Sequence, residues 1–225
     1  MKSVPASFCR AGWNQDSAIY DSCSIRFSSF LHIIYYITTT MILPIYTYGQ
    51  QVLRQEAEEI DENYPNLKQV IQDMYDTLER SEGIGLAAPQ VGLPIRLAII
   101  NLDLISEDLP EYKGYIRTFI NPYIEEVDDS ETDLMEEGCL SLPGIHEAVR
   151  RPTRIRVSYL DEDFQLHDEW VGGYLARVMQ HEFDHLDGLV FTDHLKGLRR
   201  QLTRKKLQSI VKGDFSCNYK VKVKR

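Results

Sequence analysis

Between residues 65 and 81, apolar positions recur at intervals of three and four, which places them on one face of an α-helix. The stripe consists of Leu67, Val70, Ile71, Met74, Tyr75 and Leu78. Pro65 suits the first turn of such a helix, and Gly83 suits its end. We therefore predict an amphipathic helix over residues 65–81 whose apolar face belongs to the core.

Several later stretches have the composition of β-strands. A nearly continuous apolar run indicates a buried strand after Pro94, and Asn121-Pro122 marks an edge or a bend in the next strand. The stretch after Arg154 alternates apolar and polar positions and runs into an acidic turn, which predicts a hairpin. The predicted strands cover residues 94–103, 118–127, 131–139, 154–160 and 164–170.

Two further helices are predicted nearer the C-terminus. Gly172-Gly173 interrupts the chain, and apolar residues then cover much of a helix surface up to Gly188, so we expect this helix to be buried. A last apolar stripe, with basic residues between its members, consists of Leu195, Leu198, Leu202, Leu207, Ile210 and Val211. It predicts a C-terminal helix packed on the core. Together the elements predict an α+β fold, with antiparallel or mixed β-sheets around a central buried helix, an N-terminal amphipathic helix and a C-terminal helix.

The two ends of the chain differ from the part between them. Residues 1–40 are rich in Ser and Thr and show no sustained period, and their apolar run is too short to span a bilayer. We predict that the functional protein begins at Met41, so that residues 1–40 are a disordered leader or a misassigned start. Residues 41–212 then form one domain, and residues 213–225 form a basic tail, a kind of segment that is usually solvated.

Composition and charge narrow the possible partners. Thirty-four acidic and 25 basic residues give a net charge of −9, which leaves no broad basic surface for DNA. The cysteines are scattered and form no CxxC pair, which indicates a reducing compartment: Cys9, Cys23, Cys139 and Cys217. We expect a cytoplasmic protein with no membrane and no DNA partner.

Residues 181–185 carry a His-Glu-x-x-His motif on the helix that we expect to be buried. Two imidazoles four residues apart leave the same helix face and can hold one metal ion. Glu182 lies beside them, where a carboxylate can take a proton from a metal-bound water. The simpler interpretation, a chance spacing of core histidines, is disfavoured because burying these groups without a partner would be costly.

A catalytic metal site of this kind needs a third protein ligand and one open position. Phe191 stands where one class of HExxH peptidases has a third histidine, and no glutamate follows Glu182, which excludes a second class. Asp193 and His194 remain as downstream candidates, and Cys139 is an upstream one. A lone cysteine is ordinarily a small buried hydrophobe, so the residues alone leave this choice open.

Three segments together resemble the signature motifs of the peptide deformylase family. They are residues 83–90 (Gly-Ile-Gly-Leu-Ala-Ala-Pro-Gln), 137–141 (Glu-Gly-Cys-Leu-Ser) and 180–185 (Gln-His-Glu-Phe-Asp-His), in the family's order. The resemblance extends over residues 41–212, and Pro89 stands where some members have Thr. It implies a peptide deformylase catalytic domain of the bacterial type over that range.

The resemblance also implies a role for individual residues. Glu182 would be the general base and then the general acid, and the Gln90 side chain and the Leu140 backbone N–H would form an oxyanion hole. The implied metal ligands are Cys139, His181 and His185. The implied substrate contacts are Gly83, Ile84 and Gly85. The implied cofactor is one divalent ion, ferrous iron (Fe2+) in cells, with zinc, nickel or cobalt (Zn2+, Ni2+, Co2+) as replacements.

The implied activity is that of a hydrolase in protein biosynthesis. It removes the formyl group from the N-terminal formylmethionine of newly synthesised proteins and releases formate, with metal-bound water as the attacking group and Glu182 as base. The alternatives are another HExxH metallopeptidase or amidase, and a structural metal module, which would need a fourth protein ligand. In some family members the C-terminal region contacts the ribosome, so transient ribosome contact through the basic residues 220–225 is a further, weaker expectation.

Overall fold

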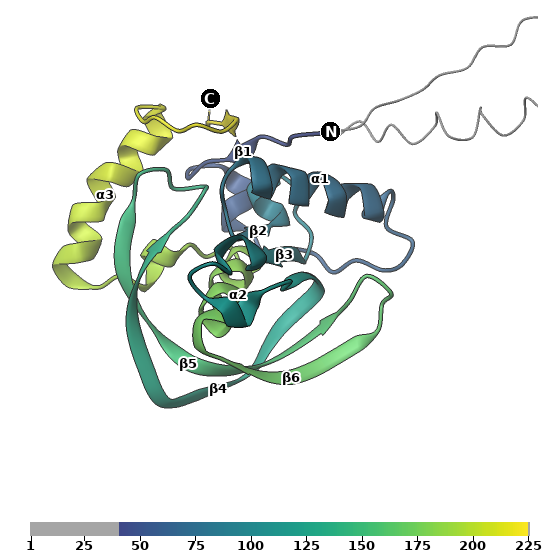
Figure 1. The fold of residues 1–225 in the computed structure, drawn as a ribbon. Helices are drawn as coiled ribbons and strands as arrows, with labels where there is room; N and C mark the ends of the chain where they lie inside the picture. The colour runs from purple at the N-terminus through teal and green to yellow at the C-terminus, as the bar shows by residue number, and fades with distance from the viewer. Residues whose placement is uncertain (1–40, 225) are drawn as a thin grey trace, which may run out of the picture. The chain divides into compact units, whose positions relative to one another are not determined.

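Five strands form one antiparallel sheet in the order β2-β3-β4-β5-β6 (Figure 1). The computed structural model describes residues 41–224, and this part of the chain also contains a sheet of two parallel strands, β1 and β7. The strands are β1 Ile45–Tyr46, β2 Gly85–Ala87, β3 Leu97–Asn101, β4 Ile116–Gly138, β5 His146–Leu160, β6 Leu166–Gly172 and β7 Val221–Lys222. The α-helices are α1 Leu67–Arg80, α2 Gly173–Leu186 and α3 Gly197–Lys212. The predicted α+β class is confirmed. The prediction about residues 1–40 lies outside the described residues.

Strand β4 runs unbroken from Ile116 to Gly138, where the sequence predicted two strands. The irregular part of β4 is the predicted bend: its register with β5 shifts between Ile120 and Tyr123, and Asn121 adopts a φ of 49°. Such bulges increase the local twist and let a long strand curve without losing its pairing. The hairpin of β4 and β5 therefore reaches from the sheet to the loop that follows Gly138.

Helix α1 packs its apolar stripe against the side of the sheet formed by β2 and β3. Leu67, Ile71, Met74 and Leu78 of the stripe are buried, whereas Val70 and Tyr75 are half-buried at its margin. Burial of four such side chains stabilises the fold by roughly 1.5–3 kcal/mol each, relative to leaving them in water. The helix then ends close to Gly83, where the chain turns into β2.

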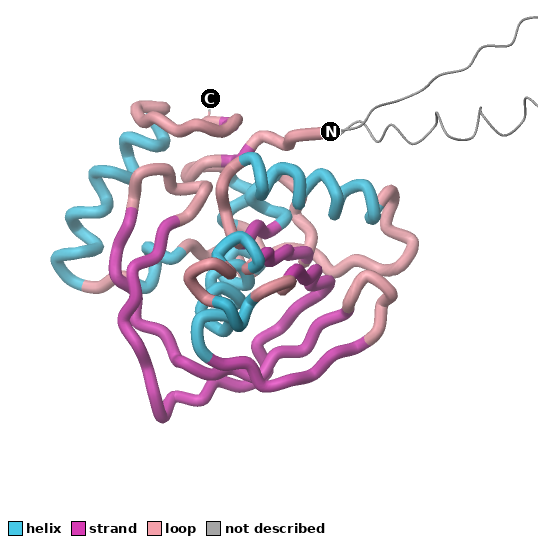
Figure 2. Tube along the Cα trace, in the orientation of Figure 1, coloured by secondary structure: helices cyan, strands magenta, loops and turns pink. Residues whose placement is uncertain are grey.

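Helix α2 contacts β2, β3, β5 and β6, and the strands curve around it (Figures 1 and 2). Its side chains Met179, Phe183 and Leu186 are buried together with Phe119 and Tyr159 of the sheet. The rings of Phe119 and Phe183 meet edge to face, with 5.8 Å between their centroids. The polar side chains that α2 carries are therefore held in a largely water-free environment.

Helix α3 departs from the prediction that its whole apolar stripe packs on the core. Leu198 and Leu202 are 67% and 60% exposed, whereas Ile210 is 2% exposed. The physical reason is the helical repeat: Leu198 and Leu207 are roughly two and a half turns apart and so lie on opposite faces. Only the face of Leu207 and Ile210 joins a core cluster, which also contains Phe191.

The C-terminal tail is also not the solvated extension that its composition suggested. Val221 and Lys222 form β7, which pairs in parallel with Ile45 and Tyr46 of β1. The first and last described segments of the chain are thus neighbours (Figure 1). Among residues 41–224, every helix is too short or too polar to cross a membrane.

Candidate metal centre

Three side chains from two elements meet beside helix α2. His181 and His185 belong to α2, and Cys139 follows directly after β4. Their ligand atoms all lie within 4.8 Å of one another, and Cys139 Sγ is 3.2 Å from His185 Nε2. The other downstream candidates point elsewhere: His194 Nε2 lies 2.7 Å from Asp184 Oδ2, and Asp193 pairs with Arg54. Of the three candidate third ligands, Cys139 is therefore the one that the fold brings to the histidines.

The chemistry of this cluster fits a divalent transition metal. A cysteine sulfur and two imidazoles are donors that zinc and iron accept, and three protein ligands leave a position open for a further ligand. Two buried polar atoms at the cluster, Glu182 Oε2 and His185 Nδ1, have no hydrogen-bond partner within residues 41–224. Unsatisfied buried groups of this kind are rare except where a bound ion, water or substrate completes the site.

The electrostatics favour the ionised thiol. Burial raises the pKa of Cys139, but the neighbouring imidazoles of His185 and His181 outweigh burial and lower that pKa to about 5. Burial opposes the charged form of His181, yet hydrogen bonds with Cys139 and Glu137 raise its pKa above the usual value. The thiolate is the form of cysteine that binds metals, so the site is prepared for one.

Glu182 has the opposite environment. Its carboxyl group is buried, and desolvation raises its pKa to about 7, against the attraction of His181 and His185. Room for this side chain depends on Gly85, because a Cβ added there would lie 2.3 Å from Glu182 Oε1. The glycine of β2 is thus required by a close approach and does not merely end a turn.

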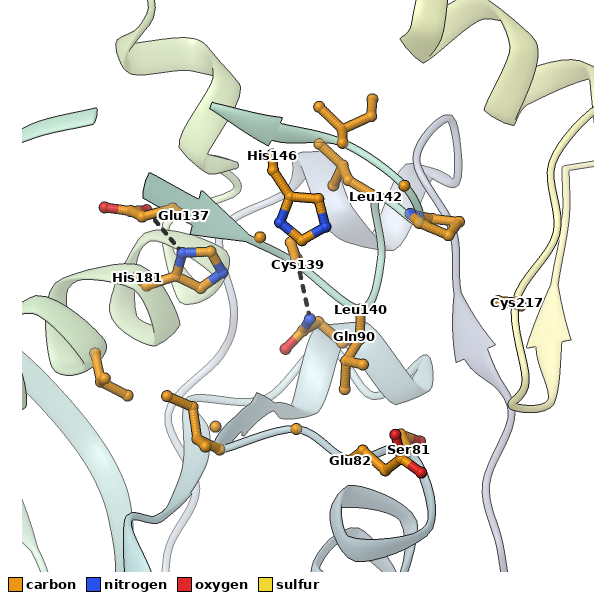
Figure 3. A pocket seen from close by; sticks show the side chains of 18 of the residues that line it. Ser81, Glu82, Gln90, Glu137, Cys139, Leu140, Leu142, His146, His181 and Cys217 are labelled. Atoms are coloured by element: carbon orange, nitrogen blue, oxygen red, sulfur yellow. Dashed lines mark hydrogen bonds and ion pairs between the residues drawn. The ribbon is translucent and has the colours of Figure 1, made fainter. Parts of the chain in front are cut away.

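Glu137 orients the first histidine, a role that the sequence analysis did not assign. Its buried carboxylate accepts hydrogen bonds from Arg151 Nε at 2.7 Å and Arg177 Nη1 at 2.7 Å, and lies 2.9 Å from His181 Nδ1 (Figure 3). Burial acts against ionisation, but these partners keep the pKa of Glu137 far below its usual value. Because Nδ1 faces a carboxylate, Nε2 of His181 is left for the cluster. The available signal was an acidic residue on a strand whose neighbours in the motif are apolar or small.

Gln90 and Leu140 lie on the near side of Cys139 (Figure 3). Gln90 belongs to a short 3-10 helix, Ala88–Val91, and its Oε1 accepts the Ala87 N–H at 2.8 Å. This contact turns Gln90 Nε2 toward Cys139 Sγ, at 3.5 Å, and toward Ser141 Oγ, at 3.3 Å. The structure therefore brings the predicted amide donor and the Leu140 backbone to the same side of the cluster.

A cavity of about 570 Å³ opens in front of these groups, a size ordinary for a small-molecule or peptide site. Gly83, Ile84 and Gly85 line one side of it, as the motif predicted. The opposite wall comes from α2 and from β4 and the loop after it. Residues 216–219 of the C-terminal tail complete the lining, and the sequence analysis had no signal for them.

Comparison with known proteins agrees with the three motifs. Residues 42–201 match the family model described as polypeptide deformylase. A peptide deformylase of Salinibacter ruber is 44% identical over 183 residues, covering 80% of this chain and 93% of that protein. A solved peptide deformylase of Plasmodium falciparum is 36% identical with a TM-score of 0.68, over 75% of this chain and 95% of that one.

A third comparison carries a ligand. The peptide deformylase of Acinetobacter baumannii, solved with Met-Ala-Ser bound, is 31% identical with a TM-score of 0.61, over 69% of this chain and 99% of that one. These relatives are metallohydrolases, and the family's need for a divalent metal agrees with the Cys139, His181 and His185 cluster. The match over most of the described chain, together with that cluster, shows that this chain belongs to the peptide deformylase family.

Proposed function

We propose that residues 41–212 form a catalytic domain that removes the formyl group from N-formylmethionyl peptides and releases formate. The observation that carries the proposal is the meeting of Cys139, His181 and His185 beside Glu182 at one cavity. Met-Ala-Ser bound to the relative from Acinetobacter baumannii supports a short peptide that begins with methionine as the occupant of this cavity.

The metal is held in this proposal by Cys139, His181 and His185. The ion is ferrous iron in the cell, and zinc, nickel or cobalt can replace it because the same donors accept them. Such an ion lowers the pKa of a water from 15.7 to about 7 and polarises a carbonyl oxygen. The ionised Cys139 thiol and the contact of Glu137 with His181 support this assignment.

Glu182 moves the proton. A carboxyl group whose pKa is about 7 can both accept and return a proton near neutral pH. Water adds to the formyl carbon while Glu182 takes one of its protons. The carbon–nitrogen bond then breaks, Glu182 gives the proton to the departing amine, and formate leaves. The central helix α2 supplies both this base and two of the metal ligands.

The oxyanion that forms on the formyl oxygen is stabilised by the Gln90 side-chain amide and the Leu140 backbone N–H. Both groups lie beside Cys139, and the contact of Gln90 with Ala87 fixes its side chain in advance. Losing one donor of this kind typically reduces kcat by about 10²–10³. Gly83, Ile84 and Gly85 hold the peptide at the β2 side, where the edge of the sheet can accept an extended chain.

The formate assay is the direct test. Protein purified without oxygen is analysed for metal and incubated with formyl-Met-Ala-Ser, with acetyl-Met-Ala-Ser as the control. We expect formate from the first peptide and no hydrolysis of the second. Cleavage of an internal peptide bond would support another HExxH metallopeptidase, and metal without any hydrolysis would support a structural metal module.

The limits and the setting of the domain belong to the same proposal. Residues 1–40 are a leader or a misassigned start, residues 213–225 are a basic tail, and the enzyme acts in the cytoplasm, where new chains emerge. The intact mass of the natively expressed protein tests the first point, and a product that retains residues 1–40 would contradict it. Co-sedimentation with ribosomes at low and high salt tests transient contact through the basic tail, which must weaken as salt increases.

A further inference from the structure

The C-terminal segment after α3 turns back onto the candidate site. The Ile45 N–H donates to the Lys220 carbonyl at 2.8 Å, and the Thr47 N–H donates to the Lys222 carbonyl at 3.2 Å. Lys222 Nζ adds a 2.9 Å hydrogen bond to the Tyr46 hydroxyl. This segment lies beyond residue 201, where the match to the family ends, so the motifs do not account for it.

Tyr219 connects this segment to the loop that carries the candidate oxyanion donor. Its hydroxyl donates to the Leu140 carbonyl at 2.8 Å, across 79 positions of sequence. Burial raises the pKa of Tyr219 well above the usual value, so the hydroxyl keeps the proton that it donates. The same loop is held from the N-terminal side, because the Tyr48 N–H donates to the Ser141 carbonyl at 2.9 Å.

The strand that β7 pairs with also supports the second donor. The Tyr46 ring of β1 lies against Gly92, where an added Cβ would be 2.3 Å from a ring atom. Gly92 ends the short helix that holds Gln90. The tail therefore contacts Leu140 directly and reaches the Gln90 helix through β1.

The segment also faces the cavity. Ser216, Cys217 and Asn218 line it next to Tyr219, and Figure 3 shows Cys217 on the C-terminal segment beyond Leu140. A segment that served only to cover apolar surface would have no reason to contact the loop of the metal ligand and also the cavity wall.

We propose that residues 214–222 are a working part of the active site and that Tyr219 is a positioning residue for the Leu140 backbone. The inference rests on the proposed function, in which the Leu140 N–H stabilises the oxyanion. Anchoring the Leu140 carbonyl fixes the peptide planes on both sides of this residue, and a displacement of about 1 Å at a reacting centre can reduce the rate about 10²-fold.

The test compares Tyr219→Phe with the wild-type enzyme on formyl-Met-Ala-Ser. We expect kcat to fall about tenfold, with KM changed less than about twofold and with unchanged metal content, because an oxyanion donor acts in the transition state and not in substrate binding. Tyr75→Phe is the matched control, since its hydroxyl lies 3.2 Å from Thr118 Oγ1, away from the cavity. We expect this control to keep the wild-type kcat.

A chain that ends at Gly213 extends the test. It loses Tyr219 and the β1–β7 pairing together, so we expect a larger fall in kcat than Tyr219→Phe gives. An active wild type with unchanged kcat in Tyr219→Phe, or an equal fall in Tyr75→Phe, would overturn this inference alone. A wild type that holds metal but releases no formate would overturn the proposed function, and this inference with it.

Discussion

Two buried glutamates on either side of His181 have opposite proton affinities. Glu137 lies among Arg151, Arg177 and His181, and these partners keep its pKa low although it is buried. Glu182 has no such basic partner at bonding distance among the described residues, and desolvation raises its pKa to about 7. The same residue type therefore serves two purposes, one as a fixed charge and the other as a group that can exchange its proton.

Glu182→Gln is expected to retain the metal and to lose activity by about 10²–10⁴-fold, because the amide keeps the size of the side chain but cannot accept the proton. Metal content and formate release, measured on the same sample, check this prediction. Near wild-type turnover in the variant would remove Glu182 from the mechanism.

Cys139→Ser is expected to weaken or alter metal binding, since a hydroxyl replaces the soft thiolate. His194→Asn is the matched control, because His194 contacts Asp184 outside the cluster, and we expect it to retain the metal. Metal content after dialysis against a weak chelator measures both. Normal metal and activity in Cys139→Ser would direct attention to Asp193 or His194 as the third ligand.

Glu137→Gln is expected to reduce metal affinity by about 10–100-fold, because it removes the charge that orients His181. It also leaves two arginines without their buried counter-charge, which costs about 3–5 kcal/mol in the free energy of unfolding. Glu131→Gln, an exposed change on the same strand, is the control. Metal titration and urea unfolding separate the two effects, and wild-type values in both would contradict the role given to Glu137.

At the scale of elements, α3 shows how a regular stripe can be divided between two faces. Spacing alone grouped Leu198 and Leu202 with Ile210, but only Ile210 reaches the core. Strand β4 shows the converse, since two predicted strands are one element whose bulges absorb the irregular part. In both elements, the local pattern is real and the contact surface selects which part of it is used.

The division of α3 can be tested by mutation. The double variant Leu198→Gln, Leu202→Gln is expected to change the free energy of unfolding by less than about 0.5 kcal/mol, because both side chains are exposed. Ile210→Ala is expected to cost about 2–5 kcal/mol, since it leaves a cavity in a core cluster. Urea unfolding of both variants measures the difference. A large loss in the double variant would mean that the exposed face is packed in solution.

For the whole molecule, the candidate site joins segments that are far apart in sequence. Residues 83–90, 137–141 and 181–185 meet around one cavity, and residues 216–219 close it. Because the unfolded chain separates these groups, a metal that binds all three ligands binds the folded state and stabilises it.

Metal removal is therefore expected to lower Tm. At a metal concentration about 1,000 times Kd, binding contributes about 4 kcal/mol, which corresponds to a shift on the order of 10 °C for a domain of this size. Scanning calorimetry before and after chelation, followed by re-addition of the metal, measures the effect. The Cys139→Ser variant should show a smaller shift, and an equal shift would contradict binding at this cluster.

Much of the protein followed from the sequence by itself. The repeat of 3.6 residues per turn predicted α1 and placed His181, Glu182 and His185 within one turn of a helix, because both depend only on neighbouring positions. The α+β class followed from the order of the elements. The third ligand did not follow from spacing, since Cys139 lies on another element, and only the resemblance to a family pointed to it.

The tertiary structure decided what depends on contacts between distant segments. It brought Cys139 and not His194 to the histidines, surrounded Glu137 with two arginines, and left Leu198 in water. It also turned the basic tail into β7 and set Tyr219 against Leu140. Periodicity cannot predict these features, because hydrogen bonds and burial between elements depend on how the faces pack, and the packing is a property of the whole chain.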